Sequence, residues 1–247
     1  MMRKHSPGFS LIEMAVVMMI LGILLSGLLT ATGQSAANTR RIDTRNQLRQ
    51  FQEALYGYAQ AFGRLPCPAI STSDGKEDPT GGGDCAVSHG FLPNSTLNLS
   101  GRTNSDGLLL DPWGNPYRYS VASVDENTTN DRAFTSATGL AQLFSDSETD
   151  LVYSANMLRI CSEINPATAF VDCDNANANI LSDLVPAVIF SMGDNWATYT
   201  STEEQENANG NNDFVNTEYS EENFDDIIIW LSPHILFSKL IAAGKLP

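Results

Sequence analysis

The chain has 247 residues, an apolar content of 42% and a formal net charge of −15. The apolar content is ordinary for a folded globular protein, which argues against global disorder. The acidic balance argues strongly against nucleic acid as a partner and against docking on anionic lipid headgroups, because both need clustered basic side chains.

The first pattern along the chain is an apolar stretch from Phe9 to Leu29, preceded by a short polar segment that contains Arg3 and Lys4. As a helix, this stretch would measure roughly 30 Å, the thickness of a bilayer core. The basic residues lie before it, so we expect a cytoplasmic N-terminus and a periplasmic remainder. A cleavable secretory signal is the alternative, but its apolar region is usually shorter and lacks a glutamate.

Glu13 is the one charged residue within this stretch. A carboxylate in lipid costs on the order of 2–3 kcal/mol, so such a residue usually has a partner. The alternative is that Glu13 lies near the membrane interface and reaches water.

The segment from Gly8 to Glu13, GFSLIE, resembles the prepilin motif of type IV pilins and of type II secretion pseudopilins. This resemblance implies that a prepilin peptidase cleaves after Gly8 and methylates Phe9. It also implies that Glu13 pairs with the amino terminus of a neighbouring subunit during assembly. The resemblance concerns about 25 residues and implies export and assembly, but no particular task for the remainder.

The helix is expected to continue beyond the membrane as an amphipathic helix and to end at Gly63 and Pro66. Apolar residues recur there at spacings of three and four, which predicts one face packed on a globular domain. They are Leu48, Phe51, Leu55, Tyr58 and Phe62. The predicted fold is α+β and pilin-like, with this long helix packed on an antiparallel sheet. The expected divisions are a leader at 1–8, a transmembrane half-helix at 9–32, a periplasmic half-helix at 33–64 and a head at 65–247.

Four cysteines form two pairs that are close in the sequence. An even number behind an export signal indicates disulfides in an oxidising compartment. Three pairings are possible, and we favour Cys67–Cys85 with Cys161–Cys173 because short loops close most easily. Free buried thiols remain the alternative.

Several short apolar runs in the head predict strands, and the last segment predicts a helix over 233–243. The last two strands are apolar throughout and are expected to be buried central strands. The predicted strands lie near 107–110, 117–124, 150–154, 186–192 and 226–231.

Two further segments resemble those of pseudopilins: DPWGNPY at 111–117 and IFSMGD at 189–194. The first is a tight turn that leads into a strand, with Trp113 free to cover the core. The second is similar to a strand and turn that, in type II secretion pseudopilins, precede an acidic loop that binds calcium.

Residues 194–226 hold ten acidic residues, seven asparagines and no lysine or arginine. Calcium takes about six to eight oxygen ligands, which this segment has in excess. Together with the resemblance, this makes calcium a candidate cofactor, with Asp194, Asp213 and Asp225 as candidate ligands. The alternative is a solvated, mobile acidic loop.

None of the three histidines accompanies a nucleophile motif such as G-x-S-x-G, so we expect no enzyme. The leading hypothesis is a structural subunit, a minor pilin or pseudopilin-like protein of a type IV pilus or type II secretion filament. Its partners would be the prepilin peptidase, other pilin or pseudopilin subunits and the inner membrane. The alternatives are an adhesin or substrate-binding module on a pilin stalk, and an anchored periplasmic protein that never polymerises.

Overall fold

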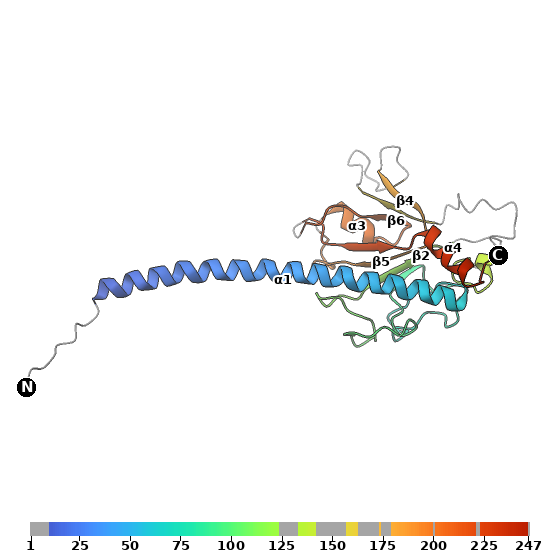
Figure 1. Ribbon diagram of the computed structural model, residues 1–247, viewed down its shortest axis with the longest axis horizontal. Helices are drawn as coiled ribbons and strands as arrows, with labels where there is room; N and C mark the ends of the chain where they lie inside the picture. Colours follow the sequence, from blue (N-terminus) through green and yellow to red (C-terminus); the bar gives the residue numbers. More distant parts are fainter. Residues whose placement is uncertain are drawn as a thin grey trace, which may run out of the picture. The chain divides into compact units, whose positions relative to one another are not determined.

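The computed structural model describes residues 10–123, 133–141, 157–162, 173, 179–199, 201–220 and 223–246, with the backbone alone for 25–35. The chain divides into two compact units, Met1–Ile42 and Asp43–Pro247. The first helix, α1 (Leu11–Phe62), contributes to both units (Figure 1).

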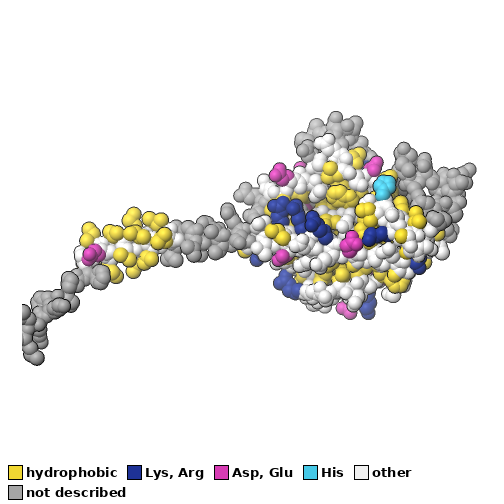
Figure 2. Space-filling view, viewed as in Figure 1, with side chains coloured by type: hydrophobic (Ala, Val, Ile, Leu, Met, Phe, Trp, Pro, Cys, Tyr) yellow, Lys and Arg dark blue, Asp and Glu magenta, His cyan; other side chains and the backbone are white. Residues whose placement is uncertain are grey.

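In the first unit, residues 11–24 of α1 are all exposed, and Figure 2 shows apolar side chains along the face of this segment that is in view. The acidic residue Glu13 lies in the first turn of the helix. Leu11 is 92% exposed and Met19 is 70% exposed. No helix among the described residues is both long enough and apolar enough to cross a membrane.

In the second unit, the predicted apolar face of α1 is confirmed in its first three positions. Leu48, Phe51 and Leu55 are buried, whereas Phe62 is 56% exposed, so the prediction is wrong for Phe62. The buried face continues through Tyr56 and Ala59 instead, because a helix of 3.6 residues per turn brings position 59 under position 55. The helix ends as predicted, with Gly63 in the left-handed region at φ +73°.

The main sheet has four antiparallel strands in the order β1-β2-β5-β7. They are β1 (His89–Phe91), β2 (Arg118–Val121), β5 (Ala187–Ser191) and β7 (Ile227–Trp230). The expectation of a buried central strand is confirmed for β5 but wrong for β7, which lies at an edge. Helix α1 contacts this edge, where the Gln52 Nε2 group donates a hydrogen bond of 2.7 Å to the Trp230 carbonyl. Such a contact occupies a backbone group that an edge strand would otherwise leave unpaired.

A second sheet of three strands, in the order β4-β3-β6, was not predicted. Strand β3 (Leu158–Cys161) pairs antiparallel with β4 (Ile180–Val185) and parallel with β6 (Asp213–Val215). Two of these strands have only three or four residues, which is too short for a periodic signal. The head therefore contains antiparallel and parallel pairing, rather than the antiparallel sheet alone.

The acidic segment is folded, so the alternative of a solvated mobile loop is wrong for its described residues. It contains β6 and a short helix, α3 (Thr202–Ala208), which begins with a capping box between Ser201 and Glu204. Helix α4 (Pro233–Ala242) lies where a helix was predicted. The predicted strand at 107–110 is absent from this described region, which forms only single bridges at Leu109 and Leu110. The predicted strand at 150–154 lies outside the described residues.

Both predicted disulfides are confirmed. Cys67 and Cys85 are joined with their Cα atoms 5.4 Å apart, and Cys161 and Cys173 with theirs 6.0 Å apart. The first lies in the main core, whereas Cys161 and Cys173 form a separate small cluster with Val215.

Candidate functional site

Of the N-terminal motif, the structure describes the part from Ser10 onwards, which includes the first turn of α1. Gly8 and Phe9, the predicted processing residues, lie outside the described residues. Ser10 donates its backbone N–H to Glu13 Oε2 at 2.9 Å, and its Oγ accepts the Ile12 N–H at 3.4 Å. The carboxylate thus caps its own helix and is favoured by the positive end of the helix dipole. Within the described part of the chain, Glu13 Oε1 accepts no hydrogen bond, so one oxygen is available to a further donor.

The DPWGNPY segment forms a turn organised by Asp111. Its Oδ1 accepts the backbone N–H groups of Trp113, Gly114 and Asn115 at 2.8–2.9 Å. Burial raises the pKa of Asp111, although these hydrogen bonds and that of Ser191 oppose the rise. Trp113 packs against the core, as the structural interpretation of this motif expected.

The two pseudopilin-like segments of the head lie side by side. Ser191 donates its hydroxyl to Asp111 Oδ2, and the Asn115 amide donates to the Gly193 carbonyl at 2.6 Å. These contacts join residues nearly eighty positions apart in the sequence, and they anchor the start of the loop that follows β5. These contacts give both motifs a structural role that requires no catalytic function.

Three buried carboxylates gather beyond this turn: Glu204, Asp225 and Asp226. One oxygen from each lies within 4.8 Å of the others. Burial, together with the nearby charge of Glu204, raises the pKa of Asp225 to about 6. Asp225 Oδ2 accepts the Asp194 N–H at 2.6 Å, while its buried Oδ1 accepts no hydrogen bond. An unsatisfied oxygen among three buried carboxylates fits the requirements of a cation.

The three predicted calcium ligands do not all come together. Asp225 belongs to the carboxylate cluster, and Asp194 contacts it through its backbone N–H while its own side chain is exposed. Asp213 instead forms an ion pair with Arg159, with its Oδ1 2.7 Å from the guanidinium. Sequence reasoning did not select Glu204 or Asp226. Two adjacent acids, Asp225 and Asp226, directly before an apolar strand are a signal that the sequence does contain. The sequence does not show that α3 brings Glu204 close to them.

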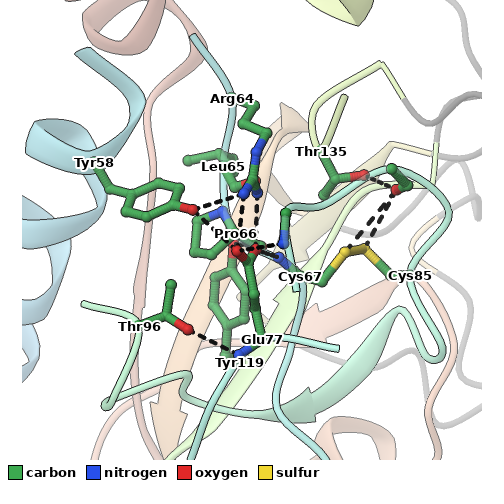
Figure 3. Close-up of polar contacts among 12 residues, drawn as sticks. Tyr58, Arg64, Leu65, Pro66, Cys67, Glu77, Cys85, Thr96, Tyr119 and Thr135 are labelled. Atoms are coloured by element: carbon green, nitrogen blue, oxygen red, sulfur yellow. Dashed lines mark hydrogen bonds and ion pairs between the residues drawn. A yellow bond between two sulfur atoms is a disulfide. The ribbon is translucent and has the colours of Figure 1, made fainter. Parts of the chain in front are cut away.

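A buried ion pair between Arg64 and Glu77, also missed by sequence reasoning, ties the end of α1 to the first disulfide loop (Figure 3). Both terminal guanidinium nitrogens of Arg64 lie 2.8 Å from Glu77 carboxylate oxygens. The Tyr58 hydroxyl donates to Glu77 and accepts from Arg64. Burial alone would raise the pKa of Glu77, but the bond and charge of Arg64 and the N–H groups of Gly81 and Cys67 lower it. Because both side chains of the ion pair are buried and bonded to each other, this network has a structural role.

Comparison with known proteins identifies the N-terminal segment only. Residues 3–29 match the family model described as the prokaryotic N-terminal methylation motif. No curated protein and no solved structure matches the chain. Proteins with this motif are structural subunits and not enzymes. The match supports the interpretation of this chain as type IV pilin-like or pseudopilin-like.

Proposed function

We propose that this protein is a structural subunit, a minor pilin or pseudopilin-like protein of a type IV pilus or type II secretion-type filament. In this proposal the prepilin peptidase removes residues 1–8 and methylates Phe9. The segment 9–32 then holds the chain in the inner membrane until the subunit enters the filament, and the head lies in the periplasm. The observation that carries the proposal is the methylation motif at residues 3–29, placed directly at the start of α1.

The geometry of Glu13 supports its proposed role in assembly. Its Oε2 is used within its own helix, and its Oε1 accepts no hydrogen bond from any described residue. A neighbouring subunit's methylated amino terminus could therefore pair with Oε1 while the helix stays capped. In a nonpolar environment, such a pair would partly offset the cost of the carboxylate.

Replacing Glu13 by alanine tests this proposal. We expect Glu13→Ala to be processed but to lose most of its incorporation into filaments, because the buried amino terminus of the neighbour would lack its partner. The measurement is the fraction of the protein in sheared filaments compared with the membrane fraction. The exposed variant Glu53→Ala serves as the control.

Mass spectrometry of the mature N-terminus separates a processing defect from an assembly defect. Both variants should show cleavage after Gly8 and one methyl group on Phe9. Normal incorporation of Glu13→Ala would contradict the assembly role and favour an anchored protein that never polymerises. An uncleaved or unmethylated N-terminus in the native chain would remove the prepilin interpretation itself.

We further propose that the head binds calcium at the carboxylate cluster, with Glu204, Asp225 and Asp226 as ligands. The unsatisfied Asp225 Oδ1 and the proximity of the three carboxylates support this. Calcium would offset the mutual repulsion of these groups and hold α3 next to β7. Gly193 is required nearby, because a Cβ atom there would lie only 2.2 Å from the Asp225 carboxyl carbon.

Thermal unfolding with and without calcium tests this second proposal. Added calcium should raise the Tm of the native chain by several degrees, and a chelator should reverse the increase, because binding to the folded state alone stabilises it. Asp226→Asn should abolish the shift, whereas Asp183→Asn, an exposed acid on β4, should retain it. A Tm that is the same in calcium and in chelator would remove calcium from the description of this protein.

A further inference from the structure

A cavity of about 270 Å³ lies beside the main sheet, and neither proposal above uses it. Its lining combines Arg118 of β2 with the aromatic side chains of Phe91, Trp196 and Tyr199, and with Ser71 and Asp106. A concave apolar surface with a few polar groups is the usual form of a small-molecule site.

Arg118 supplies the positive charge of this cavity, whose lining also includes the acidic Asp106. In the sheet register it lies opposite Phe91 on one side and Phe190 on the other. Its guanidinium carbon lies 4.9 Å from the centre of the Phe91 ring, and burial lowers the pKa of the group. No described residue forms an ion pair or hydrogen bond with this guanidinium. A partly buried cation without a bonded counter-charge is costly, and an anionic ligand at the guanidinium would reduce that cost.

Trp196 and Tyr199 supply exposed aromatic surface on the loop after β5. They are 48% and 38% exposed. The loop is held at its start, where the Asp194 N–H donates to Asp225 and Asn115 donates to the Gly193 carbonyl, both at 2.6 Å. The fold therefore fixes the start of the loop that carries these two exposed aromatic side chains beside Arg118. Trp, Tyr and Arg are the residue types that contribute most of the binding energy at protein–protein interfaces.

We propose that this cavity binds a carboxylate-bearing sugar residue, a hexuronate. The planar guanidinium of Arg118 matches a carboxylate through two parallel hydrogen bonds. The flat apolar face of a pyranose ring can stack on Trp196, and the exposed Ser71 and Asp106 at the rim can bind hydroxyl groups. The volume is below the roughly 300–1,000 Å³ of sites for drug-sized ligands, which favours one sugar unit. The proposal does not depend on filament assembly.

Isothermal titration calorimetry on the full chain, in a detergent without a sugar headgroup, tests this site with glucuronate, glucose and acetate. Glucuronate should bind more tightly than either of the others, because only glucuronate offers both the carboxylate and the ring. Arg118→Gln should weaken glucuronate binding by at least about tenfold. Arg118→Lys should restore part of the loss, because it keeps the charge without the planar pair of donors.

Matched controls exclude a general effect of charge or exposed apolar area. Arg49→Gln removes an exposed arginine of α1 outside the cavity and should leave binding unchanged. Trp196→Ala should weaken binding, whereas Ile235→Ala, at the same 48% exposure on α4, should not.

Three results would overturn the proposal. One is the absence of glucuronate binding to the native chain, and another is equal binding to folded Arg118→Gln. The third is binding of glucose or acetate as tight as that of glucuronate. If Arg118→Gln unfolded, Arg118→Lys and Trp196→Ala would carry the same test, with unchanged Tm as the criterion of folding.

Discussion

At the scale of single residues, acidic side chains in this protein are held in three different ways. Glu13 caps its own helix, and Glu77 is paired with a buried arginine. Asp225 lies among other carboxylates, where burial and the charge of Glu204 raise its pKa. Arg64 lies 13 positions from Glu77, and Glu204 lies 21 positions from Asp225. Composition alone therefore does not distinguish a structural acid from a candidate ligand.

Glu77 makes a testable contribution to stability. Glu77→Gln leaves the buried Arg64 guanidinium without its counter-charge, so the free energy of unfolding should fall by about 3–5 kcal/mol. The exposed acid Glu53, whose Oε2 lies 3.4 Å from Lys239 Nζ, provides the control. Glu53→Gln should change the free energy of unfolding by less than about 1 kcal/mol. Urea denaturation of both variants at neutral pH gives the comparison. Equal losses would contradict the structural role of the ion pair.

The same residue predicts a dependence on pH. The pKa of Glu77 is lowered in the folded state, so its contribution is present above the unfolded pKa of about 4.3 and is lost as the pH falls through the folded value. The native chain should therefore lose stability below about pH 4 more steeply than Glu77→Gln. If the stability of the two proteins fell with pH in parallel, the pKa of Glu77 would be the same in the folded and unfolded states, which would contradict this prediction.

At the scale of elements, long periodic segments were predicted better than short ones. The buried face of α1 and helix α4 have enough residues for a recognisable period, and the short central strand β5 is marked by its continuous apolar run, Ala187 to Phe190. Strands β3 and β6 have four and three residues, and they become strands only through pairing, β3 with both β4 and β6 and β6 with β3. Local propensity at such lengths is weaker than the tertiary contacts that decide the outcome.

The two disulfides should differ in their effect on these elements. The loop closed by Cys67–Cys85 contains Glu77 and lies in the main core, whereas Cys161–Cys173 joins a small separate cluster. Replacing Cys67 and Cys85 by alanine should therefore lower the free energy of unfolding by at least about 2–4 kcal/mol. The same change at Cys161 and Cys173 should cost less. Urea denaturation under non-reducing conditions checks the order, and the reverse order would contradict it.

At the scale of the whole molecule, the N-terminal methylation motif and the head occupy separate parts of the chain. The methylation motif occupies residues 3–29, and the head unit begins at Asp43. The proposed calcium cluster and the proposed hexuronate cavity both adjoin the loop after β5, whose start is anchored to the turn at Asp111. That turn therefore helps to position two candidate sites, and its residues Asn115 and Pro116 also line the cavity.

The sequence by itself determined the N-terminal motif, the long helix and the disulfide pairing, because each depends on residues that are close together in the chain. Only the tertiary structure decided which acids are ligand candidates. Asp213 forms an ion pair with Arg159, while Glu204 on α3 comes within 4.8 Å of Asp225 and Asp226, from which it is separated by more than twenty positions in the sequence. It also decided that the Arg118 guanidinium forms no ion pair or hydrogen bond with any described residue. Such outcomes depend on which side chains the packed strands and loops bring within a few ångströms, and spacing along the chain does not determine that distance.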